Sequence, residues 1–209
     1  PGDPNLLTLG AVDAINRAQV IVISCAEHRM LLGSDFLELR PDVRIVLAGD
    51  ADEEAVALPS QPGGAPTPVD VDEHCTDLIA TVIEAASQGL EVVRLVSGDP
   101  FLDGDIGAEA AAVARADHDV DVIPGVTGMT AVPEYAGLIL HGHDVQLIGD
   151  AACQRDIAGH GPDWSDQGLI VVHTSAGKLK EVVKHAVASG RSEDEPAAHP
   201  HCAQTQPRV

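Results

Sequence analysis

The chain has 209 residues, enough for one large or two small domains with a real hydrophobic core. Its 33 acidic and 12 basic residues give a formal net charge of −21. The negative electrostatic field of such a charge repels the phosphate backbones of nucleic acids, so we expect no nucleic acid partner. No apolar run approaches the ~20 residues that a transmembrane helix needs, so we expect no membrane span.

Apolar periodicity and turn residues predict helices that alternate with strands. In chain order we predict a helix over 5–17, a strand over 20–23, a short helix over 27–32, a strand over 43–47, a surface loop over 50–68, a helix over 70–87, a strand over 92–96, a helix over 106–115, a strand over 120–123, a helix over 126–135, strands over 145–148 and 169–172, and a helix over 176–189. This order is typical of an α/β protein with mostly parallel sheets.

The turn Pro124-Gly125 marks the predicted domain boundary. It separates an N-terminal α/β lobe over 1–124 from a C-terminal α/β lobe over 125–209, and we expect the ligand cleft between the two lobes. The chain opens on Pro1-Gly2-Asp3-Pro4, a turn sequence, from which we expect that a strand and a glycine-rich turn precede it.

The cysteines and histidines bear on compartment and metals. The four cysteines are scattered without a CxxC pair, and no basic-plus-apolar signal stretch opens the chain, so we expect reduced thiols in a cytoplasmic protein. The ten histidines lack zinc-like spacing and are interpreted as polar loop residues, so no metal site is predicted.

The segment Ser97-Gly98-Asp99-Pro100 follows a predicted buried strand. A glycine there lets a ligand approach the backbone, whose N–H groups can hold an amino-acid carboxylate or a ribose hydroxyl. An ordinary Gly-Asp-Pro turn is the alternative interpretation. The dinucleotide fingerprint G-x-G-x-x-G is absent after the first strand, which disfavours the usual Rossmann dehydrogenase or methyltransferase.

Two segments together, RLVSGDPFLDG and IPGVTGMTAVPEYAGLIL, resemble the patterns RLKGGDPFxFG and VPGVTSxxAxxAYAGIPL of the tetrapyrrole methylase family. Within that family the chain is most similar to the uroporphyrinogen-III C-methyltransferases. The resemblance covers almost the whole chain, and it implies the two-lobed methylase fold with S-adenosylmethionine as cofactor. It also implies a tetrapyrrole substrate and a homodimer.

The resemblance further implies which residues bind the cofactor. Transferred position by position, they are Pro1, Ser97, Gly98, Asp99, Leu102, Thr127, Gly128, His173 and Ala203. The last two depart from the family pattern, which has a methionine at the first position and a glycine at the second.

The predicted substrate side departs further from the family. Ser24 stands where the family has an aspartate, Val96 replaces a lysine, and Ala48-Gly49-Asp50 replaces a basic segment. No catalytic residue is therefore assigned.

Two hypotheses remain open. In the first, the chain is a methyltransferase that acts on uroporphyrinogen III in the precorrin-2, sirohaem and cobalamin branch. In the second, it is a degenerate methylase-fold domain of the type fused to uroporphyrinogen-III synthase, kept for binding or assembly. A sibling methylase that acts on another precorrin is a third possibility.

Overall fold

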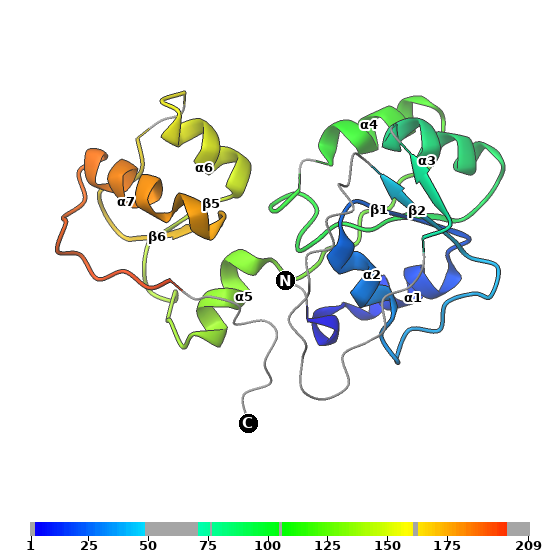
Figure 1. Cartoon of the computed structure of the whole chain (residues 1–209), viewed down its shortest axis with the longest axis horizontal. Helices are drawn as coiled ribbons and strands as arrows, with labels where there is room; N and C mark the ends of the chain where they lie inside the picture. Colours follow the sequence, from blue (N-terminus) through cyan, green and yellow to red (C-terminus); the bar gives the residue numbers. More distant parts are fainter. Residues whose placement is uncertain (1–2, 49–70, 76, 105, 161–162, 200–209) are drawn as a thin grey trace. The chain divides into compact units, whose positions relative to one another are not determined.

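The structure is a computed structural model that describes residues 3–48, 71–75, 77–104, 106–160 and 163–199. The chain divides into two compact units, Gly2–Val126 and Thr127–Val209, and each is an α/β body in its own right (Figure 1).

The first unit holds a four-stranded parallel sheet in the order β3-β2-β1-β4. Its elements, in chain order, are η1 Pro4–Leu6, α1 Leu9–Arg17, β1 Val20–Ile23, α2 Ala26–Leu32, β2 Arg44–Ala48, β3 Glu73–Cys75, α3 Leu78–Ser87, β4 Val92–Arg94 and α4 Gly107–Arg115. The strand order places β1, the most apolar strand, between β2 and β4, so its backbone pairs on both sides.

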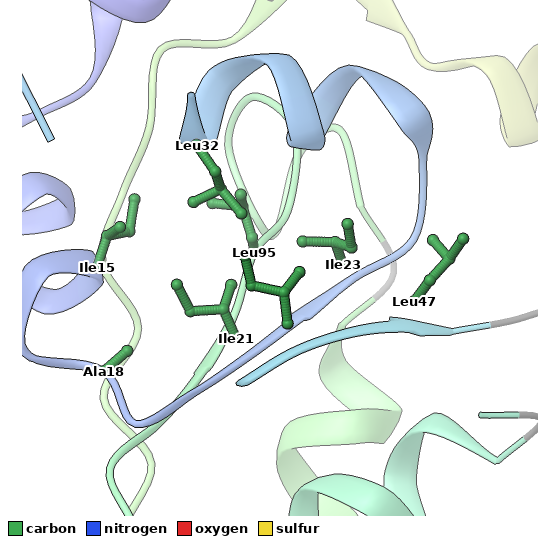
Figure 2. Close-up of a cluster of buried hydrophobic side chains, with 8 residues drawn as sticks. Ile15, Ala18, Ile21, Ile23, Leu32, Leu47 and Leu95 are labelled. Atoms are coloured by element: carbon green, nitrogen blue, oxygen red, sulfur yellow. The ribbon is translucent and has the colours of Figure 1, made fainter. Parts of the chain in front are cut away.

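Both faces of β1 are buried, as a continuous apolar run predicts for a parallel strand covered by helices. On one face, Ile21 and Ile23 pack with Ile15 of α1 and Leu32 of α2 (Figure 2). Leu95, just beyond β4, completes the cluster drawn there.

The other face of β1 packs against α3. Val20 and Val22 meet Ala85 of that helix together with Val46 of β2. Because helices cover both faces, a ligand can reach the strand backbone only at the edges where the strands end. The carboxyl edge is the one at which parallel α/β sheets bind ligands.

The second unit is built around a parallel pair, β5 with β6. Its elements are α5 Gly128–Tyr135, β5 Val145–Ile148, α6 Asp150–Ile157, β6 Leu169–Val172, η2 Ala176–Lys178 and α7 Leu179–Ala188. Ile148, Cys153 and Trp164 form its buried core, and the Trp164 Nε1–H donates to Asp156 Oδ2 at 2.8 Å. The hydrogen bond satisfies both polar groups in an apolar surrounding.

The α/β class with parallel sheets is confirmed, and most predicted elements are present. One predicted strand is wrong: residues 120–123 pair with no strand in the part of the chain that the structure describes, and Val120, Val122 and Ile123 are 36–40% exposed. Asp121 interrupts the apolar pattern, and no described strand lies beside the segment to complete its backbone hydrogen bonds. The predicted loop over 50–68 lies outside the described residues.

Four other elements differ from the prediction: α1 and α3 in where they begin, and β3 and α6 in being present where no such element is predicted. The Thr8 and Asp77 side chains cap α1 and α3 at their first turns, so both helices begin later than predicted. The residues ahead of Asp77 include β3, and α6 falls between the strands predicted over 145–148 and 169–172, where no helix is predicted. The α6 sequence DAACQRDI is too polar to show helical periodicity.

Candidate functional site

A turn over residues 97–104 leaves the carboxyl edge of the first unit's sheet. β4 lies at the end of the sheet beside β1, and the Leu95 N–H still donates to the Val22 carbonyl at 2.9 Å. Beyond Leu95 the chain leaves the ladder. The turn therefore starts at the edge where ligands bind in open α/β sheets.

Two aspartates hold the turn closed. The Asp99 Oδ1 accepts from the N–H groups of Phe101 and Leu102, both at 3.0 Å. The Asp103 Oδ2 accepts from the Asp99 N–H at 2.7 Å. Both carboxylates thus have internal donors, and the Asp99 side chain shapes the turn as Asx turns do.

Glycine is required at one position of this turn, Gly98, and at one position of the neighbouring turn, Gly125. Gly98 has φ +71°, in the left-handed region, and a Cβ there would overlap the Asp103 carboxylate. A Cβ on Gly125 would overlap the carbonyl oxygen of Gly98. The Thr8 hydroxyl, at 3.4 Å, donates to the Pro124 carbonyl. The two glycine turns that the sequence singles out therefore lie in direct contact within one unit.

A buried histidine lies behind the turn. His28 of α2 is 4% exposed, and its Nε2 lies 2.9 Å from the Ser97 Oγ. Burial, helped by the nearby Arg94 cation, lowers the pKa of His28 to about 4 although Glu27 opposes it. The imidazole is neutral at physiological pH. No local pattern could predict this contact, because the two residues are 69 positions apart.

Arg94 lies beneath the same edge. Its Nη1 donates to the Ser24 Oγ at 3.3 Å and to the Leu95 carbonyl at 2.6 Å, and its Nε contacts Glu109 Oε2 at 3.2 Å. Ser24 occupies the position where the family pattern has an aspartate. Arg94 therefore meets a neutral hydroxyl there rather than a second carboxylate.

Apart from His173, the predicted cofactor residues fall into three groups. Ser97, Gly98, Asp99 and Leu102 come together in the turn after β4, with the Leu102 side chain 43% exposed. In the second unit, Thr127 caps α5 by accepting from the Met129 N–H at 3.1 Å, and Gly128 is the first residue of that helix. The third group is Pro1 and Ala203, which lie outside the described residues.

His173 follows β6 in the second unit. It is exposed, and its backbone N–H donates to the Ile148 carbonyl at 2.9 Å. The N–H therefore extends the parallel β5–β6 ladder by one bond. The imidazole itself remains accessible at the carboxyl end of this strand pair.

The part of the chain that the structure describes bears on metal binding and on membrane-spanning helices. There, no three histidine, cysteine, aspartate or glutamate side chains gather closely enough to hold a metal ion. Among the described helices none is both long and apolar enough to cross a bilayer.

The fold and this edge define an α/β protein with a glycine-dependent turn at the carboxyl end of a parallel sheet. The family model for tetrapyrrole (corrin/porphyrin) methylases matches residues 1–199, and the chain belongs to that family.

Curated relatives agree with this assignment. The chain is 32% identical to a uroporphyrinogen-III C-methyltransferase of Sinorhizobium sp over 206 residues, which cover 95% of this chain and 66% of that protein. It is 31% identical to siroheme synthase 1 of Pectobacterium atrosepticum, covering 95% of this chain and 38% of that protein. The chain thus spans less than two thirds of the length of either relative.

Solved structures share the fold. A cobalt precorrin-4 methyltransferase superposes with TM-score 0.61 at 18% identity, covering 92% of this chain and 72% of that one. Uroporphyrin-III C-methyltransferase from Thermus thermophilus gives TM-score 0.59 at 22% identity, covering 92% and 70%. A structure of the same Thermus protein complexed with S-adenosylhomocysteine gives TM-score 0.53 at 22% identity, covering 92% and 74%.

Proposed function

We propose that the chain is an S-adenosylmethionine-dependent C-methyltransferase whose substrate is uroporphyrinogen III. The observation that carries the proposal is the turn after β4 at the carboxyl edge of the sheet, where Gly98 has a positive φ and packs closely against Gly125. Family membership and the S-adenosylhomocysteine held by the Thermus relative support the same cofactor here.

The residues around the turn fit a ligand with an amino-acid end. The two aspartates already accept hydrogen bonds from the turn itself, so their carboxylates are engaged within the turn. In this proposal Ser97, Gly98, Asp99 and Leu102 hold the cofactor from the first unit. Thr127, Gly128 and His173 hold it from the second, with Pro1 and Ala203 as further contacts.

When bound, S-adenosylmethionine supplies an electrophilic methyl group on a sulfonium centre. The protein's task is to hold the pyrrole carbon in line with that methyl, because orientation removes much of the barrier to such a transfer. No residue is assigned as the proton acceptor. Ser24, at the family's aspartate position, has no charge with which to act as one, and its hydroxyl is hydrogen-bonded by Arg94.

The neutral Ser24 favours the second candidate function, a methylase-fold domain that binds ligand but transfers methyl slowly or not at all. A missing catalytic carboxylate of this kind costs ~2–4 kcal/mol of transition-state stabilisation when the group acts electrostatically. We further propose that the protein is cytoplasmic, in keeping with the three described cysteines being free thiols. We also propose a homodimer, on the family resemblance alone.

Methyl transfer itself decides between the two functions. The purified chain is incubated with uroporphyrinogen III and methyl-labelled S-adenosylmethionine under anaerobic conditions, and label in the tetrapyrrole is counted. Label that accumulates over several turnovers supports the methyltransferase. Cofactor binding without label in the tetrapyrrole supports the degenerate domain instead.

Ser24→Asp is the informative variant, because it restores the acid of the family pattern beside Arg94. A rise in rate identifies this position as the reason for slow transfer. Ser87→Ala serves as the matched control, since Ser87 ends α3 on the exposed surface and hydrogen-bonds His118 there.

A further inference from the structure

The Ser97 hydroxyl is held by a buried partner rather than by solvent. Ser97 is exposed, whereas His28 is 4% exposed and reaches it with Nε2 at 2.9 Å. In the family pattern this position is a glycine, which has no hydroxyl to hold. The chain thus adds a polar group at the edge where a ligand binds, together with the means to orient it.

The proton on the imidazole decides which way that hydroxyl acts. The Nδ1 atom of His28 is buried and has no hydrogen-bond partner among the described residues. A buried N–H without a partner is rarer and more unfavourable than a buried lone pair. The tautomer with the proton on Nε2 is therefore preferred, and it donates to the Ser97 Oγ. The Ser97 O–H is then a donor, and the Cys25 side chain is a neighbouring acceptor for it.

One cation, Arg94, lies close enough to Ser97 to act on its partner His28. Arg94 also donates to Ser24 and to Glu109, and Glu27 acts on His28 in the opposite sense. The carboxylates of Asp99 and Asp103 accept N–H groups within the turn. Burial raises the pKa of the neighbouring Cys25 thiol, so that side chain stays neutral and competes weakly for the hydroxyl.

We propose that Ser97 is a specificity-determining residue that donates its hydroxyl proton to a carboxylate of the bound ligand, and that His28 is the positioning residue that fixes this donor. The inference rests on the proposed function, because that function supplies two carboxylate sources. One is the amino-acid end of the cofactor, and the other is the acetate and propionate side chains of the tetrapyrrole.

Three probes separate these sources by calorimetric titration. S-Adenosylhomocysteine carries the amino-acid carboxylate, 5′-methylthioadenosine lacks it, and uroporphyrin III carries only the tetrapyrrole carboxylates. A hydrogen bond to a charged group corresponds to a roughly 10- to 100-fold change in affinity. We expect Ser97→Ala to weaken one carboxylate-bearing probe by at least about tenfold and to leave methylthioadenosine within about twofold.

The variants of His28 test the positioning role. His28→Phe removes the donor and should weaken the same probe as Ser97→Ala does, whereas His28→Gln keeps an N–H donor and should restore most of the affinity. The double variant Ser97→Ala/His28→Phe should bind no more weakly than Ser97→Ala alone, because both remove one interaction. Ser87→Ala breaks a similar serine–histidine pair on the exposed surface and should change nothing.

Each other outcome overturns the inference. Unchanged affinity of Ser97→Ala for both carboxylate probes removes the proposed role while the wild-type binding still supports the methylase function. An equal loss for methylthioadenosine identifies a general disturbance of the turn. If the wild-type chain binds none of the probes, the proposed function fails and the role of Ser97 fails with it.

Discussion

The neutral, buried His28 makes the stability of the first unit depend on pH. Its pKa is 6.5 when exposed in the unfolded chain and about 4 in the fold, where burial and Arg94 disfavour the imidazolium. Between these values the unfolded chain binds a proton that the folded chain does not. The contribution of His28 to the free energy of unfolding is therefore largest above pH 6.5, where the imidazole is neutral in both states. This contribution is lost as the pH falls from 6.5 toward 4.

The size of the effect follows from the same two pKa values. At pH 5 the linkage removes about 2 kcal/mol relative to pH 7.5, and the full shift corresponds to about 3 kcal/mol. Replacing His28 by Gln removes the titrating group. Urea unfolding of both proteins is followed by circular dichroism at pH 7.5 and pH 5.0. The many carboxylates titrate in both proteins, so their effect cancels when the two changes in unfolding free energy are subtracted, and the contribution of His28 remains.

The wild type should lose about 2 kcal/mol more than His28→Gln on this acidification. The exposed His143 supplies the matched control, and His143→Gln should follow the wild type at both pH values. A difference between wild type and His28→Gln that stays constant from pH 7.5 to 5.0 would refute the burial argument and the neutral imidazole with it.

Other substitutions test the turn, the second core and a helix cap. Gly125→Ala should destabilise the chain by ~1–3 kcal/mol and abolish S-adenosylhomocysteine binding in a titration, because its Cβ meets the Gly98 carbonyl, whereas Gly107→Ala has free space and should do neither. Trp164→Phe leaves the buried Asp156 carboxylate without its indole donor and should cost ~1–3 kcal/mol in urea unfolding; wild-type stability would contradict the hydrogen bond. Thr127→Ala should lower stability by ~1 kcal/mol through loss of the α5 cap, and Thr127→Ser should recover it; equal losses for both would show that the hydroxyl is not what matters.

The sequence predicts the parallel α/β class because its signal is local and strong. The run Val20–Ile23 is apolar at every position, and all four residues are buried in a strand paired on both sides. The segment 120–123, Val-Asp-Val-Ile, is interrupted by Asp121, and it pairs with no strand among the described residues. Strand formation needs a partner edge, and no local pattern shows whether one is available.

In the candidate site, too, residues within one segment could be predicted from the sequence, whereas a contact between distant segments could not. The turn residues Ser97, Gly98 and Asp99 could be predicted from spacing and resemblance, because they lie in one continuous segment. His28 could not, since its contact with Ser97 joins residues far apart in the chain and depends on the packing of α2 over the sheet. Whether the predicted residues act as cofactor ligands stays a prediction.

Binding of S-adenosylhomocysteine at the turn after β4 is the most direct test of the account. Calorimetric titration compares the wild-type chain with Gly98→Ala, whose added Cβ would overlap the Asp103 carboxylate at a backbone angle that favours glycine. Gly107→Ala, which meets open space, is the control. Saturable binding by the wild type and the control, lost in Gly98→Ala, is the predicted result. Equal binding by all three proteins, or no binding by the wild type at millimolar ligand, would contradict a cofactor site at this turn.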